Sequence, residues 1–142
     1  MNTTSEKQTR ATATRFAKTL KPGAVLVFTG DLGGGKTTFT KGLAAGLGLA
    51  DAVTSPTFVL MQIYKKKKSG RGKIARLYHF DLYRIKSAQE LHDLGFDDFI
   101  SDPEAVTVLE WGEKFPELVP DNAIHVLFKN LGGEKREIII KK

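Results

Sequence analysis

The chain has 142 residues, of which 41% are hydrophobic and 27% charged, a composition typical of a soluble globular protein with a buried core. Its apolar runs are too short for a transmembrane helix, and the polar residues 1–5 lack the apolar core of a signal peptide. Because the chain has no cysteine, disulfide scaffolds and thiolate metal sites are excluded as well. We therefore predict a cytoplasmic protein without a membrane partner that forms a single domain over residues 1–142.

The net charge of +6 is distributed unevenly along the chain. Residues 87–121 contain ten acids and one base (Lys114), a local charge of −9, which leaves +15 for the remainder. Separate acidic and basic regions are compatible with several kinds of partner, so charge alone does not identify one. The lysine run at residues 65–68 predicts a solvated hairpin tip or a contact site for RNA or an acidic protein surface.

The first part of the chain predicts alternating helices and strands. Ser5 is placed to cap a helix with Gln8 as its capping-box partner, and Pro22 ends that helix. Residues 24–29 are apolar on both faces, which indicates a buried strand of a parallel sheet. A glycine-rich loop over residues 30–35 then leads into a second helix that starts near Lys36.

The remainder of the chain contains shorter elements. In chain order we predict a loop over 53–57, a hairpin of strands 58–64 and 74–83, short helices over 87–94 and up to Ile100, a strand over 105–109, a short helix over 113–118, and a final hairpin of strands 123–128 and 136–140. The fold class is therefore α/β, with a central parallel sheet, antiparallel strands at its margins and flanking helices.

Residues 30–37 fit the pattern G-x-x-x-x-G-K-[ST] of phosphate-binding loops, or P-loops. Glycines let the backbone approach phosphates, and a helix that begins at the loop presents unpaired amides there. Lys36 would neutralise the β- and γ-phosphates, and the Thr37 hydroxyl would bind Mg²⁺. Because the loop lies between a buried strand and a helix, we predict a P-loop NTPase-like domain with these nucleotide-binding residues in the loop: Asp31, Leu32, Gly33, Gly34, Gly35, Lys36, Thr37 and Thr38.

A P-loop enzyme also needs an acid at the end of a neighbouring strand to bind Mg²⁺. Glu110 ends the apolar run 105–109, and Asp81 lies near the end of the strand 74–83, so both are candidates. Thr57 is placed either in a switch segment near the γ-phosphate or in an ordinary Ser-Pro turn. Trp111 is either a packing residue or part of the site. The three histidines lack metal-ligand spacing and are interpreted as structural: His79, His92 and His125.

Several motifs together resemble the bacterial TsaE (YjeE) family, the ATPases of tRNA threonylcarbamoyladenosine (t⁶A) biosynthesis. They lie at residues 30–39, 54–58, 78–84, 90–91 with 94–95, and 109–111. The resemblance implies a P-loop ATPase that uses ATP and Mg²⁺ and acts with the TsaB and TsaD proteins. TsaD transfers threonylcarbamoyl to adenosine 37 of tRNA, and whether this chain contacts tRNA directly is left open.

The resemblance also implies roles for single residues. It assigns Lys36 to phosphate binding, Thr37 and Glu110 to Mg²⁺, and Asp81 to the catalytic acids. It further assigns nucleotide contacts to these residues: Thr9 near the adenine, Thr57 in the switch loop, and Trp111 at the edge of the site.

Two departures from the family pattern stand out. Gly34 replaces an alanine that is frequent in the family, and the lysine-rich hairpin tip is longer and more basic than expected.

Two alternative functions are also known for proteins with a P-loop sequence or a basic hairpin. A small P-loop kinase needs a helical substrate domain and a lid, for which the loop and hairpin after the second helix leave little space. A nucleotide-dependent RNA-binding module would use the basic hairpin to contact tRNA. The loop contains no arginine, and the nearby candidates are Arg76 and Arg84 on a later strand. This shortage predicts an ATPase that is slow alone.

Overall fold

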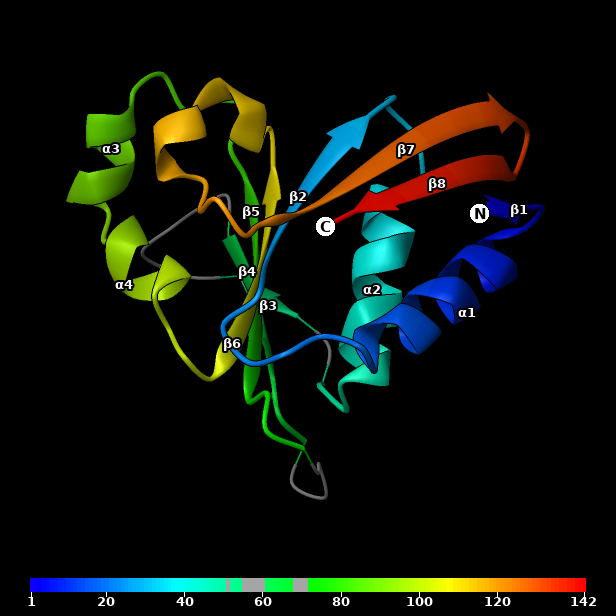
Figure 1. The fold of residues 1–142 in the computed structure, drawn as a ribbon, viewed down its shortest axis with the longest axis horizontal. Coiled ribbons are helices and arrows are strands. Elements are labelled where there is room, and N and C mark those ends of the chain that lie inside the picture. Colours follow the sequence, from blue (N-terminus) through cyan, green and yellow to red (C-terminus); the bar gives the residue numbers. More distant parts are fainter. Residues whose placement is uncertain (51, 55–60, 68–71) are drawn as a thin grey trace.

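The structure is a computed structural model that describes residues 1–50, 52–54, 61–67 and 72–142. Its strands form one sheet in the order β1-β8-β7-β2-β6-β5-β4-β3 (Figure 1). The strands are β1 (Asn2–Thr3), β2 (Val25–Gly30), β3 (Val53–Thr54), β4 (Met61–Lys65), β5 (Arg76–Asp81), β6 (Ala105–Glu110), β7 (Ile124–Gly132) and β8 (Lys135–Lys141). The helices are α1 (Glu6–Ala17), α2 (Lys36–Gly46), α3 (Ala88–Asp93), α4 (Phe96–Ile100) and the 3₁₀ helices η1 (Gly112–Lys114) and η2 (Pro116–Leu118).

The centre of the sheet is parallel and its margins are antiparallel. Strand β2 pairs in parallel with both β6 and β7, and β5 pairs in parallel with β6. Strands β3 and β4 on one side, and β8 and β1 on the other, pair antiparallel. The predicted fold class is therefore confirmed, and the carboxyl ends of β2, β5 and β6 lie side by side at one edge of the sheet.

Helices cover both faces of the sheet, which explains why its central strands are apolar on both sides. Helices α1 and α2 lie on one face, and α3 and α4 lie on the other (Figure 1). On the α1–α2 face, the rings of Phe28, Phe39 and Phe128 pack edge to face at centroid distances of 5.0 to 5.7 Å. On the opposite face, Phe80 packs against Phe96 of α4 at 5.1 Å.

Close packing between α1 and α2 fixes the helix that follows the glycine-rich loop. A β-carbon at Gly42 would lie 2.5 Å from the carbonyl oxygen of Arg10, and one at Gly46 would lie 2.6 Å from that of Thr14. The Thr14 hydroxyl in turn donates a hydrogen bond of 3.0 Å to the carbonyl of Gly42. These two glycines therefore permit a helix contact that any larger residue would prevent.

The structure differs from the sequence-based prediction in local details. Strand β1 had no counterpart in the prediction, and Val53–Thr54 form a short strand instead of a loop. The predicted helix over 113–118 is divided into η1 and η2, because Pro116 supplies no amide donor to continue one helix. Ser5 does cap α1, but the Gln8 side chain accepts from the amide of Thr4 rather than from that of Ser5.

Several of the predicted features lie outside the described residues. Part of the 53–57 loop with Thr57, the start of the 58–64 strand and the tip of the lysine-rich hairpin lie at residues 55–60 and 68–71. The assignment of one domain to residues 1–142 stays a prediction. Among the described residues, the helices are too short or too polar to cross a membrane.

An ion pair joins β5 to the loop before β6, at the end of the sheet opposite Asp81. Arg76 donates from Nε to Oδ2 of Asp102 at 2.9 Å, and the hydroxyl of Tyr78 donates to the same oxygen at 2.7 Å. Hydrogen bonding to Arg76 is the main reason that the pKa of Asp102 is lowered to about 2. Arg76 is therefore committed to a structural contact and does not reach the glycine-rich loop.

Asp102→Asn should lower the free energy of unfolding at neutral pH by about 1 to 2 kcal/mol, as measured in urea. The depressed pKa of Asp102 means that its stabilisation is complete well above the ordinary value of 3.8 and is lost as the pH falls toward 2. The difference between parent and variant should therefore shrink across that range. Asp98→Asn, at an exposed carboxylate of α4, is the control and should change stability little. A difference that stays constant down to pH 2 would contradict this account.

Candidate functional site

The glycine-rich loop begins where β2 passes close to β7. Gly30 has a φ of 123°, and a β-carbon at this position would clash with the carbonyl oxygen of Phe128. The amide of Asp31 donates to that same carbonyl at 3.1 Å, and the Asp31 carboxylate accepts from the amide of Asn130 at 3.1 Å. The Asp31 side chain therefore fastens the loop to β7.

The loop is also tightly packed at Gly34. A β-carbon there would lie 2.9 Å from both the carbonyl oxygen of Asp31 and the β-carbon of Phe128. An alanine at this position would require a shift of the loop. Glycine at this position therefore allows the loop to pack closely on β7.

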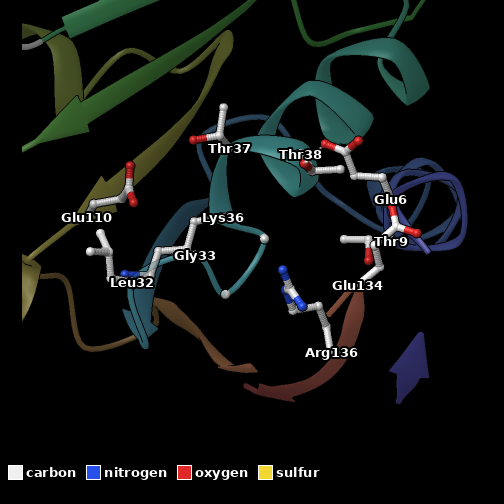
Figure 2. Close-up of a pocket in the computed structure, with 12 residues that line it drawn as sticks. Glu6, Thr9, Leu32, Gly33, Lys36, Thr37, Thr38, Glu110, Glu134 and Arg136 are labelled. Carbon is white, nitrogen blue, oxygen red and sulfur yellow. Dashed lines mark hydrogen bonds between the residues drawn. The ribbon is translucent and has the colours of Figure 1, made fainter. Parts of the chain in front are cut away.

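A cavity of about 360 Å³ lies over the loop and the beginning of α2 (Figure 2). Its walls come from β6, β8 and α1 as well as from the loop itself. The lining residues are Glu6, Thr9, residues 32–38, Glu110, Glu134 and Arg136. The structure therefore brings together most of the site residues predicted from the sequence, including Thr9, Lys36, Thr37 and Glu110.

Glu110 and Asp81 lie at the ends of adjacent parallel strands and are paired in register. Glu110 lines the cavity, whereas Asp81 does not, and the Asp81 carboxylate accepts a hydrogen bond of 3.1 Å from the amide of Tyr83. The buried side chain of His79 lies 2.5 Å from Oε2 of Glu110. His79 therefore fixes the orientation of the Glu110 carboxylate, a contact that its interpretation as a structural histidine did not include.

Thr9 and Thr38 connect α1 with the start of α2. The buried Thr9 hydroxyl shares a 2.7 Å hydrogen bond with Thr3, and its methyl group faces Gly35, 3.5 Å from where a β-carbon would be. The Thr38 hydroxyl donates to Oε1 of Glu6 at 3.2 Å. Figure 2 shows the Thr37 hydroxyl directed to the side of the cavity where Glu110 lies.

Trp111 lies beside the cavity rather than in its lining. Its backbone has a φ of 66°, in the left-handed region that costs a non-glycine residue free energy. Nζ of Lys36 lies 5.8 Å from the centroid of the Trp111 ring. The centroids of the Tyr83 and Trp111 rings are 5.1 Å apart. Trp111 therefore contacts the lysine of the loop directly, which favours the site interpretation over a pure packing role.

Arg136 and Glu134 belong to the cavity but were not among the predicted site residues. Both come from the β7–β8 hairpin, which reaches over the N-terminal ends of α1 and α2 (Figure 1). Arg136 donates from Nη1 to the carbonyls of Gly133 at 2.7 Å and Lys135 at 2.8 Å, so its guanidinium is held against the hairpin turn. The sequence predicts the hairpin, but it carries no signal that this hairpin lies beside β2.

The described residues contain no group of three or more His, Cys, Asp or Glu side chains arranged to hold a metal ion. Among the oxygen-bearing side chains that line the cavity, the Thr37 hydroxyl is directed to the side where the Glu110 carboxylate lies (Figure 2).

Together these features define an α/β protein with a phosphate-loop sequence that connects a central parallel strand to a helix, at the edge of the sheet where the carboxylates gather. The profile of "Threonylcarbamoyl adenosine biosynthesis protein TsaE" matches residues 3–138. The chain therefore belongs to the TsaE family, and with it to tRNA threonylcarbamoyladenosine biosynthesis.

Individual relatives agree with this assignment. The chain is 39% identical to the tRNA threonylcarbamoyladenosine biosynthesis protein TsaE of Bacillus subtilis, over 96% of this chain and 80% of the relative. It is 35% identical to that of Treponema pallidum, over 96% and 95% of the two chains. The crystal structure of Bacillus subtilis YdiB superposes with a TM-score of 0.71 at 34% identity, covering 97% of this chain and 80% of YdiB.

Proposed function

We propose that the chain binds ATP with Mg²⁺ and hydrolyses it, and that it acts in t⁶A biosynthesis together with the TsaB and TsaD proteins. The observation that carries the proposal is the single cavity in which the loop of residues 30–37, the N-terminus of α2 and the carboxylate of Glu110 meet.

The loop has the shape and chemistry to receive phosphates. Gly35 has a φ of 96° at the N-cap of α2 and has no side chain to cap the helix, so the amides of the first turn are available to a phosphate. Lys36 supplies an ammonium group at the start of α2, and moving from the Trp111 ring to a phosphate exchanges one favourable cation contact for a stronger one.

The donors beside the loop suit Mg²⁺. A hydroxyl and a carboxylate are hard oxygen ligands, and Mg²⁺ is commonly held by one or two such groups together with phosphates and water. Thr37 and Glu110 are the residues that would hold it, with Glu110 oriented by His79. The bound ion would neutralise charge that develops on the phosphates during transfer. To Asp81, which is paired in register with Glu110 on the adjacent strand, we assign the orientation of a water molecule next to Glu110.

The opposite end of the cavity suits the nucleoside. Thr9 and Glu6 of α1 and Arg136 of β8 line this end, away from Glu110 (Figure 2). The Thr9 methyl and the aliphatic stem of Arg136 supply apolar surface beside Gly35, at 3.5 and 3.7 Å from the position of a β-carbon. We assign the adenosine to this end, in agreement with the role that the family resemblance gives to Thr9.

The chain lacks an arginine in the loop, and Arg76 is bound to Asp102, so we expect slow hydrolysis by the isolated protein. A TsaB–TsaD complex should raise the rate, because groups supplied or ordered by a partner accelerate P-loop hydrolases by about 10³ to 10⁵ in known systems. The acidic segment 87–121 offers negative charge for docking to a TsaB–TsaD complex. We place this activity in the cytoplasm, where tRNA is modified.

Steady-state phosphate release tests the proposal, with and without TsaB–TsaD at low salt and with and without Mg²⁺. We expect slow, Mg²⁺-dependent hydrolysis by the chain alone and a large increase with the complex. Rapid hydrolysis that does not respond to TsaB–TsaD would contradict the partnership. Absence of hydrolysis under every condition, in a protein shown to be folded, would contradict the ATPase assignment itself.

A further inference from the structure

Lys114, the one base of the acidic segment 87–121, binds the turn that follows β5. Its Nζ donates to the carbonyl oxygens of Tyr83 at 2.6 Å, Ile85 at 2.9 Å and Leu82 at 3.3 Å. An ammonium group has three N–H donors, so all three are directed at the same turn. Lys114 itself ends η1, four residues after Glu110.

The two segments that Lys114 joins are the continuations of the two strands that carry the carboxylates. Asp81 ends β5 just before the turn at residues 82–85, and Glu110 ends β6 just before η1. One further backbone hydrogen bond joins the two segments after Asp81 and Glu110: the amide of Leu82 donates to the carbonyl of Glu110 at 3.0 Å. Beyond that bond, the hydrogen bonds of Lys114 replace those of the sheet as the connection between the two chain segments.

A row of cations and rings runs from Lys114 to the glycine-rich loop. Nζ of Lys114 lies 5.9 Å from the Tyr83 ring centroid, the Tyr83 and Trp111 rings are 5.1 Å apart, and Nζ of Lys36 lies 5.8 Å from the Trp111 ring. Tyr83 is 61% and Trp111 38% exposed, so neither ring is enclosed in the core. Because Lys114 binds the carbonyl of Tyr83, it fixes the residue whose ring contacts Trp111.

We propose that Lys114 is a positioning residue: it fixes the 82–85 turn against η1 and thereby holds Asp81, Glu110 and Trp111 in one arrangement at the ends of β5 and β6. This inference rests on the proposed ATPase for its effect on turnover, but its effect on Trp111 is independent of any nucleotide. Lys114 does not line the cavity, so it affects nucleotide binding only indirectly.

Lys114→Met tests the inference, because methionine keeps much of the side-chain length and removes the donors. Trp111 is the only tryptophan in the chain, so the intrinsic fluorescence of the nucleotide-free protein reports its surroundings. We expect Lys114→Met to change the emission maximum and to increase quenching by acrylamide. We also expect kcat for ATP to fall roughly 10- to 100-fold, with KM little changed, because misplaced catalytic groups affect the transition state most.

Two further variants separate positioning from a general effect on the fold. Lys114→Arg retains several N–H donors and should recover part of the parent fluorescence and kcat. Lys86→Met removes a lysine that lies one residue beyond the same turn and should behave like the parent. Unfolding in urea shows which variants are folded.

A folded Lys114→Met with parent-like fluorescence and kcat would overturn the inference, and so would equal changes in Lys86→Met. If the parent releases no phosphate, the proposed ATPase fails, and the fluorescence comparison still decides whether Lys114 holds Trp111.

Discussion

Replacing Lys36 with alanine should reduce ATP hydrolysis by at least about 100-fold, the loss typical of removing one group that stabilises transition-state charge. Lys36 begins α2, and its ammonium group lies 5.8 Å from the centroid of the Trp111 ring. Without it, the β- and γ-phosphates would lose the cation that the P-loop sequence supplies to them. Nucleotide affinity should fall as well, because the same charge is present in the ground state.

The measurement is phosphate release together with equilibrium binding of a fluorescent ATP analogue. Lys41→Ala is the matched control, since it removes an exposed lysine from the same helix, one and a half turns further on. Thermal unfolding of both variants should resemble that of the parent. Hydrolysis at the parent rate by a folded Lys36→Ala protein would contradict the assignment of the loop to phosphate binding.

The parts of the site that the sequence predicted are those that depend on local order along the chain. The loop at residues 30–37, the buried strand before it and the helix after it are encoded by neighbouring residues, and the structure contains all three in that order. Glu110 and Asp81 could be predicted because a buried parallel strand must end at the carboxyl edge of the sheet, whichever strand lies beside it.

The parts that could not be predicted depend on which distant segments become neighbours. Arg136 reaches the cavity only because β7 pairs with β2 while β8 pairs with β7, and periodicity along the chain does not determine strand order. The contact between His79 and Glu110 likewise needs the register of β5 on β6. Trp111 contacts Lys36 through a left-handed backbone conformation that its residue type does not favour.

Replacing Glu110 with glutamine should lower kcat for ATP hydrolysis by about 10² to 10³-fold while changing nucleotide affinity far less. Glutamine preserves the size of the side chain and removes the charge that would face Mg²⁺. The amide of glutamine can still meet His79, so the change removes charge without leaving that buried side chain unpaired. The variant should also require more Mg²⁺ to reach its maximal rate.

Asp81→Asn should show a smaller loss than Glu110→Gln, because Asp81 lies one strand further along and does not line the cavity. Glu113→Gln is the control, since Glu113 is an exposed carboxylate in η1 that is also absent from the lining. Single-turnover hydrolysis, measured beside equilibrium binding, separates the rate from the affinity. Equal losses of affinity and rate would assign Glu110 to ground-state binding rather than to the transition state. Parent-like rates in both Glu110→Gln and Asp81→Asn would show that neither carboxylate takes part in catalysis.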